Sequence, residues 1–199
     1  MLGILISVIT GIVLGIFYKV DILIEYANPL SSFGLCLLLF FVGVDIGRNK
    51  EIVTHLRMMS KKVFLLPAVG IVGSLVGGAL AATVLSLNVK ECVTVAAGLG
   101  WYSFSAIEVG KVSAYLGGVT FLANVFRELF AIIFVPVIAK KIGPYESVIT
   151  GGATAMDSVL PIINKSNPPR ISIVGFYSGL VMSIVVPILV PAVIKIFNL

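Results

Sequence analysis

Residues 63–89 read VFLLPAVGIVGSLVGGALAATVLSLNV and form the longest stretch of the chain without a charged side chain. A helix that crosses a bilayer needs about 20 predominantly apolar residues, so this stretch is long enough to span one. Inside lipid, every backbone N–H and C=O must be hydrogen-bonded within the protein, and a helix achieves this within a single segment. The stretch therefore predicts a transmembrane helix and indicates an all-α integral membrane protein.

The composition of the whole chain supports the same fold class. Hydrophobic residues make up 59% of the 199 residues, charged residues only 12%, and the mean hydropathy is +1.14. An ordinary soluble domain is about 45–50% apolar and about 25% charged. Because so few charges cannot cover a chain of this length with a wettable surface, we exclude a soluble enzyme, a secreted disulfide scaffold and a disordered chain.

The sequence contains no constellation typical of catalysis. It has a single histidine, and we find no serine–histidine, metal-ligand or phosphate-loop pattern. We therefore expect no enzymatic activity, no cofactor and no metal. The net charge is +5, but the basic residues lie in short connecting segments, which is typical of a topology signal and not of a nucleic-acid surface. No nucleic-acid partner is expected.

Four further stretches predict membrane-spanning helices, at residues 1–18, 26–44, 117–139 and 171–194. Two other apolar segments, at about 92–109 and 148–164, are crowded with glycine, proline and polar residues. Such interrupted segments are typical of the discontinuous helices and re-entrant hairpins of transporters. We expect one transmembrane transporter domain over residues 1–199, in which residues 1–62 contribute two helices and residues 63–199 form the core.

The positions of the basic residues distinguish hairpins from simple spans. The basic loop 47–62 is predicted to be cytoplasmic, because short cytoplasmic loops are enriched in Lys and Arg. If 92–109 dips in from the outside and 148–164 from the inside, Lys140, Lys141 and the Lys165–Arg170 segment are also cytoplasmic. We therefore expect about five transmembrane helices and two re-entrant hairpins of opposite orientation, in a multi-pass protein of the inner membrane. Seven simple spans are the alternative.

Arg127 and Glu128 lie in the middle of the predicted 117–139 helix. A charge at the centre of such a helix costs about 2.5–3.5 kcal/mol, so these side chains are expected to face protein or a watery cavity. Adjacent helical residues point about 100° apart, so the two do not face each other well. Asn124 can share a polar face with either. The pair either holds helices together or lines a transport path.

The second interrupted segment contains Asp157, which follows Gly151 and Gly152 and is flanked by the hydroxyls of Thr154 and Ser158. Glycines permit the close backbone approaches and irregular turns of a hairpin tip. A carboxylate at such a tip suits cation binding or proton transfer. A simpler role for Asp157, compatible with the first, is to cap the second half of the hairpin.

The first interrupted segment places Gly98 and Gly100 just before Trp101, Tyr102 and Ser103. Trp and Tyr together are typical of the membrane interface. An indole face also binds an ammonium group by cation–π attraction. The spacing leaves both interpretations open. Glu108, later in the same segment, is either another functional acid or a residue at the water-exposed mouth of the hairpin.

Several runs together resemble the lysine exporters of the LysO type. They are Gly100-Trp101-Tyr102-Ser103, Asn124-Val125-Phe126-Arg127-Glu128-Leu129, residues 151–161 and residues 37–44 with Arg48-Asn49. The resemblance implies secondary active export of L-lysine, and of toxic lysine analogues, through functional acids that match Glu128 and Asp157. Coupling to protons or sodium is expected. The α-carboxylate is expected to meet backbone N–H groups at the hairpin tips.

Familiar members of this family are longer at the N-terminus, and in some organisms a small separate protein supplies that part. We therefore expect a small N-terminal partner subunit or a homo-oligomer. Two alternatives stay open. One is a carrier of another small organic substrate, such as a carboxylate read by Arg127. The other is a membrane subunit that does not transport without its partner.

Overall fold

The computed structural model describes residues 61–199 and, before them, only scattered positions between residues 10 and 44, all of them helical. The predicted spans 1–18 and 26–44 lie largely outside the described residues, and so does the basic loop 47–62. The chain divides into two compact units, residues 1–48 and 49–199, and only the second is described in detail below.

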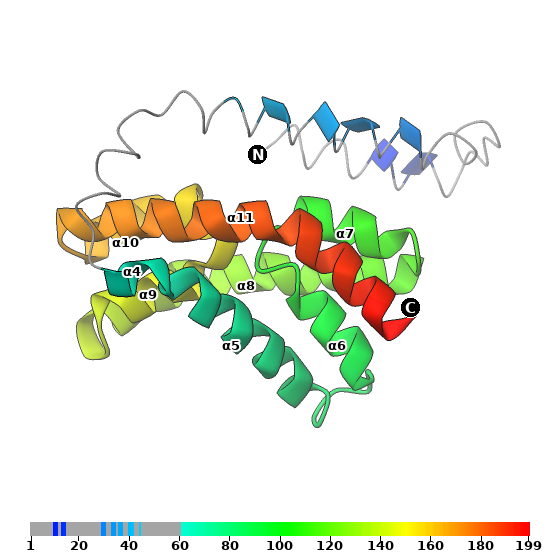
Figure 1. The fold of residues 1–199 in the computed structure, drawn as a ribbon, viewed down its shortest axis with the longest axis horizontal. Helices are drawn as coiled ribbons and strands as arrows, with labels where there is room; N and C mark the ends of the chain where they lie inside the picture. Colours follow the sequence, from blue (N-terminus) through cyan, green and yellow to red (C-terminus); the bar gives the residue numbers. More distant parts are fainter. Residues whose placement is uncertain are drawn as a thin grey trace. The chain divides into compact units, whose positions relative to one another are not determined.

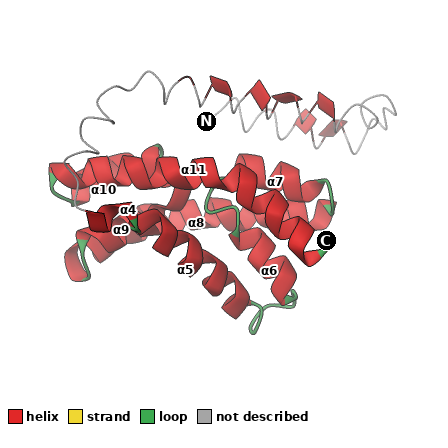
Figure 2. Ribbon diagram, in the orientation of Figure 1, coloured by secondary structure: helices red, strands yellow, loops and turns green. Residues whose placement is uncertain are grey.

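The described part of the second unit is helical throughout, as predicted, and contains no strand (Figures 1 and 2). Its elements are α4 (Lys61–Phe64), α5 (Leu66–Ala81), α6 (Val89–Ala96), α7 (Tyr102–Gly110), α8 (Ala114–Lys141), α9 (Pro144–Gly151), the 3-10 helix η1 (Gly152–Met156), α10 (Leu160–Ser166) and α11 (Pro169–Phe197).

Two helices, α8 and α11, are long and apolar enough to cross a membrane, with 28 and 29 residues. The helices predicted at 117–139 and 171–194 are thus confirmed, and each extends a few residues further at both ends. Pro136 lies inside α8, and Pro187 and Pro191 lie inside α11. Membrane helices tolerate such prolines because neighbouring groups satisfy the freed backbone.

The prediction of one helix across 63–89 is wrong at its C-terminal end. Helix α5 has only 16 residues and ends at Ala81, and the chain then turns before α6. The hydroxyl of Thr83 donates to the carbonyl of Leu80 over 2.7 Å, which supports the turn. Asn88 then starts α6, because its side chain and that of Glu91 form a capping box. Polar residues therefore end the apolar helix early.

Both interrupted segments are broken helices, as predicted. In the first, residues 97–101 separate α6 from α7, and Leu99 and Gly100 have positive φ angles of 50° and 101°. In the second, α9 gives way to η1 at Gly152, whose φ is 61°, and α10 follows. The observed segments, 89–110 and 144–166, are slightly longer than the predicted ones.

Each broken segment folds back toward the end of the unit from which it came (Figure 1). Helix α6 runs inward from the end where α8 begins, and α7 returns to that end. Helix α9 runs inward from the opposite end, and α10 returns there. The amide of Asn167, after α10, donates to the hydroxyl of Ser147, in the first turn of α9, over 3.1 Å. This bond closes the base of the second segment.

Glycines bring the broken segments close to the long helices. A Cβ on Gly117 of α8 would lie 2.7 Å from the Cα of Gly110 in α7. A Cβ on Gly179 of α11 would lie 2.8 Å from the carbonyl oxygen of Ala153 in η1. An apolar core made of buried residues from α4, α8, α9, η1, α10 and α11 surrounds the second segment.

Candidate functional site

One face of α8 carries the buried polar residues of the long helix. Thr120, Asn124 and Glu128 are all buried and recur every four residues, which places them on the same side. Asn124 therefore shares its face with Glu128, one of the two arrangements that the sequence allowed. The face contacts both broken segments, so it positions polar groups against the hairpin tips.

Asn124 holds the tip of the first segment. Its side-chain oxygen accepts a hydrogen bond from the N–H of Gly100 over 2.7 Å, and its amide nitrogen donates to Val95 and Thr120 carbonyls over 3.2 and 2.9 Å. A Cβ on Gly98 would lie 2.7 Å from that amide nitrogen, so the close approach requires glycine. Asn124 is thus a structural clamp on the tip.

The two tips meet each other. The N–H of Ala153 donates to the carbonyl of Leu99 over 2.9 Å. A Cβ on Gly152 would overlap that same carbonyl oxygen, and a Cβ on Gly100 would lie 3.8 Å from the carbonyl oxygen of Gly151. The four glycines singled out in the sequence, Gly98, Gly100, Gly151 and Gly152, therefore lie at or beside this junction.

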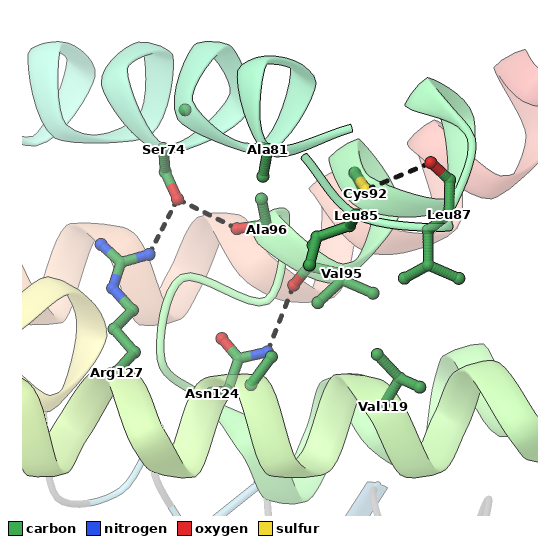
Figure 3. A pocket seen from close by; sticks show the side chains of 13 residues that line it. Ser74, Ala81, Leu85, Leu87, Cys92, Val95, Ala96, Val119, Asn124 and Arg127 are labelled. Atoms are coloured by element: carbon green, nitrogen blue, oxygen red, sulfur yellow. Dashed lines mark hydrogen bonds between the residues drawn. The ribbon is translucent and has the colours of Figure 1, made fainter. Parts of the chain in front are cut away.

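Arg127 leaves α8 toward α5 (Figure 3). One guanidinium nitrogen donates to the hydroxyl of Ser74 over 2.8 Å, and that hydroxyl donates to the carbonyl of Ala96 over 3.1 Å. A Cβ on Gly152 would lie 3.0 Å from the other guanidinium nitrogen, so the group also rests against the second tip. Arg127 and Glu128 form no ion pair with each other, as their spacing predicted.

A cavity of about 290 Å³ opens beside Arg127, between α5, α6 and α8 (Figure 3). It is mainly apolar, and Arg127, Asn124 and Ser74 supply the polar groups of its wall. Small residues on α5 leave the space. The lining residues are Ser74, Gly77, Gly78, Ala81, Leu85, Leu87, Cys92, Val95, Ala96, Val119, Ala123, Asn124 and Arg127.

The two predicted acids differ in their surroundings. Glu128 is only 9% exposed, and within the part of the chain that the structure describes its carboxylate has no hydrogen bond or ion pair. Asp157 is exposed, and its carboxylate accepts hydrogen bonds from the N–H and the hydroxyl of Ser158. Helix α10 begins after Val159 without a side-chain cap, so Asp157 does not cap it. The ring of Tyr102, at the start of α7, packs edge-on against that of Phe121 in α8, with the centroids 5.6 Å apart.

The remaining predicted residues have more local contacts. Trp101 is half-buried, and its ring lies 5.4 Å from that of Phe104. The Thr154 hydroxyl donates to the carbonyl of Gly151 over 2.7 Å. Ser103 is half-buried and forms no side-chain hydrogen bond to another described residue. Glu108 pairs with Lys111 over 2.7 Å at the end of α7, which fits its placement at the mouth of the hairpin.

Sequence reasoning missed three polar residues of this region. Ser74 binds Arg127, Thr120 is fully buried beside Asn124, and Ser105 donates from its hydroxyl to the carbonyl of Trp101 over 2.7 Å. Ser74 had a usable signal, because it is the only hydroxyl between residues 63 and 82. Among residues 61–199, no group of three or more His, Cys, Asp or Glu side chains is placed to hold a metal ion.

A model of the lysine exporter LysO family matches residues 5–194. The chain belongs to this family. It is 30% identical over 170 residues to the lysine exporter LysO of Escherichia coli strain K12, covering 84% of the present chain and 56% of the relative. It is 31% identical over 184 residues to a proposed lysine exporter of Haemophilus influenzae, covering 92% of both. No solved structure matches the chain significantly.

The chain therefore spans about half the length of the Escherichia coli lysine exporter and nearly all of the Haemophilus influenzae protein. Family membership confirms the resemblance that the motifs indicated. Together with the two long apolar helices, it identifies the chain as a membrane protein of a transporter family.

Proposed function

We propose that this chain is a secondary active exporter of L-lysine and lysine analogues in the cytoplasmic membrane, and not an enzyme. Its membership of the lysine exporter LysO family supports this cargo. The observation that carries the proposal is Glu128, a buried acid on the polar face of α8 with no cationic partner among residues 63–199. An uncompensated carboxylate in a membrane helix is costly unless a cation or proton joins it. A lysine ammonium group is such a cation.

The two acids have separate roles in this proposal. Glu128, buried on α8, binds the ammonium group of the cargo. Asp157, exposed at the second tip, exchanges a coupling ion, and a proton is the simplest one. Trp101 and Tyr102, at the first tip, are the aromatic residues assigned to cation–π attraction in this proposal. A proton that enters through Asp157 and displaces lysine from Glu128 would link proton entry to lysine exit.

The topology belongs to the same proposal. The two broken segments enter the membrane from opposite faces as re-entrant hairpins, and their tips meet near its middle. The backbone bond between Ala153 and Leu99 supports this arrangement. A small N-terminal partner subunit or a second copy of the chain is the proposed partner.

Efflux of labelled L-lysine from proteoliposomes tests the function. Glu128→Gln and Asp157→Asn are each expected to lower the efflux rate at least about tenfold, because a charged hydrogen-bond partner contributes about 1.5–3 kcal/mol. Glu108→Gln is the matched control, since its acid pairs with Lys111 at the end of α7, and it should keep the wild-type rate. Unchanged efflux in both acid variants would overturn the assigned roles.

One observation favours a second cargo. Arg127, with its guanidinium beside a cavity and no acidic partner among residues 61–199, suits a carboxylate. In this alternative the protein carries a small organic anion with sodium or protons at Asp157. This alternative would be favoured if the wild-type protein takes up an organic anion but transports no lysine, and if Arg127→Gln abolishes the anion uptake. A chain that transports nothing until a partner is added would instead indicate a non-transporting subunit.

A further inference from the structure

Arg127 has more hydrogen-bonding capacity than the structure uses. A guanidinium carries five N–H donors and no acceptor. In residues 61–199, one bond to the Ser74 hydroxyl is its only side-chain hydrogen bond, and no carboxylate lies within ion-pair distance. A cation in the middle of a membrane helix is costly without an anionic partner. The group is therefore poised for an anion.

The cavity beside Arg127 has room for such an anion. Its volume of about 290 Å³ is at the lower end of the range of about 300–1,000 Å³ that small-molecule sites occupy. Arg127, Asn124 and Ser74 supply its polar groups, and most of the other lining residues are apolar. A small ligand with one anionic end and an aliphatic body fits this wall.

The backbone groups of the first tip are already bonded. The N–H groups of residues 98–102 all have acceptors, which are four backbone carbonyls and the side chain of Asn124. The N–H of Ala153, in the second tip, is bonded to Leu99. These particular donors are therefore not free for a cargo carboxylate in this conformation.

We propose that Arg127 binds the α-carboxylate of the exported amino acid in the cavity between α5, α6 and α8, and that Ser74 is its positioning residue. The inference rests on the proposed lysine export and assigns the carboxylate end of that cargo. Arginine suits the role because its planar fork matches both oxygens of a carboxylate. The hydroxyl of Ser74 fixes one side of the fork.

Glu128 follows Arg127 on α8 but is not among the residues that line the cavity, so the cavity itself selects the carboxylate end of the cargo. Arg127 and Glu128 are adjacent but leave α8 in different directions, and they do not neutralise each other. An amino acid carries both a carboxylate, which matches Arg127, and an ammonium group, which matches Glu128. A diamine or an amino-acid amide satisfies only Glu128.

Competition against labelled-lysine binding by the full chain tests the inference, with L-lysine and L-lysinamide as competitors. The wild-type protein should bind lysine about 10- to 100-fold more tightly than lysinamide. Arg127→Gln should remove this preference by weakening lysine alone. Ser74→Ala should reduce the preference partially. If lysine binds too weakly for the competition assay with labelled lysine, isothermal titration calorimetry measures the affinities of lysine and lysinamide directly.

Arg127→Lys serves as the second variant if Arg127→Gln does not fold. It keeps the charge but loses the fork, so its preference for lysine should fall between the wild-type value and none. If the Arg127 variants weaken the binding of lysine and lysinamide equally, or leave the preference for lysine unchanged, this inference fails while the proposed function stands. A wild-type protein that binds no lysine would overturn the proposed function and this inference with it.

Discussion

Leu99 and Gly152 both hold backbone conformations with positive φ, and they meet at the junction of the two tips. Such conformations cost about 1–3 kcal/mol for a residue other than glycine, and they persist where the surrounding structure imposes them. Leu99 is fully buried, and its carbonyl accepts the bond from Ala153. The strain is therefore located in the contact that joins the two halves of the core.

Gly152→Ala is expected to destabilise the protein by about 1–3 kcal/mol. The added methyl group meets the carbonyl oxygen of Leu99, which is backbone and cannot swing away, and the φ of 61° is strained for alanine. Gly73→Ala is the matched control, because nothing lies within 4 Å of its added methyl group and alanine favours the helix. Thermal unfolding in detergent measures both. If Gly152→Ala and the wild-type protein unfold at the same midpoint temperature, the close contact between Gly152 and Leu99 at the junction is contradicted.

At this scale the sequence predicted residue types better than contacts. Gly98, Gly100, Gly151 and Gly152 were recognisable because glycine permits tight turns. Glu128 and Arg127 were recognisable because charge is costly in a membrane helix. Ser74 stood out as the only hydroxyl between residues 63 and 82, but its partner could not be predicted, because its bond to Arg127 joins residues 53 positions apart and depends on how α5 packs on α8.

The broken segments are the elements that decide the topology. Labelling of single cysteines from each side of the membrane tests their orientation, in a chain whose Cys36 and Cys92 have been replaced. Ser103→Cys, at the first tip, should react with a membrane-impermeant maleimide only from the outside. Ser158→Cys, which is exposed at the second tip, should react only from the inside. Opposed hairpins require this difference.

Two end positions calibrate the labelling. Lys111→Cys, after α7, should react from outside, and Lys140→Cys, at the end of α8, from inside. If either tip cysteine shows the labelling pattern of a simple span, by reacting from both sides, that segment is not a re-entrant hairpin. The control positions show whether the reagent reached the expected side.

Element boundaries followed from local chemistry only in part. The breaks at residues 97–101 and at Gly152 were predictable from glycine content. The early end of α5 at Ala81 was not, because hydropathy does not register Thr83 bonding back to Leu80 or Asn88 capping the next helix. The length of a charge-free run therefore overestimates the helix where hydroxyl and amide side chains compete for the backbone.

On the scale of the whole second unit, four basic residues lie together at one end, whereas Lys90, Lys111 and Lys195 lie at other helix ends. Helix α8 finishes with Lys140 and Lys141 where α10 finishes with Lys165 and α11 begins beside Arg170 (Figure 1). The positive-inside rule predicts that this end is cytoplasmic. On that prediction, the two broken segments approach the middle from opposite compartments, and the contact between their tips is expected to separate the two compartments.

A barrier of this kind must open for transport, because alternating access exposes one site to each side in turn. Joining the tips covalently should therefore stop export. Leu99→Cys with Ala153→Cys places two thiols on residues whose backbones are hydrogen-bonded over 2.9 Å. Oxidation with copper phenanthroline should abolish lysine efflux, and reduction should restore it. Mass spectrometry verifies the cross-link, and each single-cysteine variant, oxidised in the same way, should transport normally. A cross-linked protein that exports lysine at the full rate would show that the tips do not part during transport.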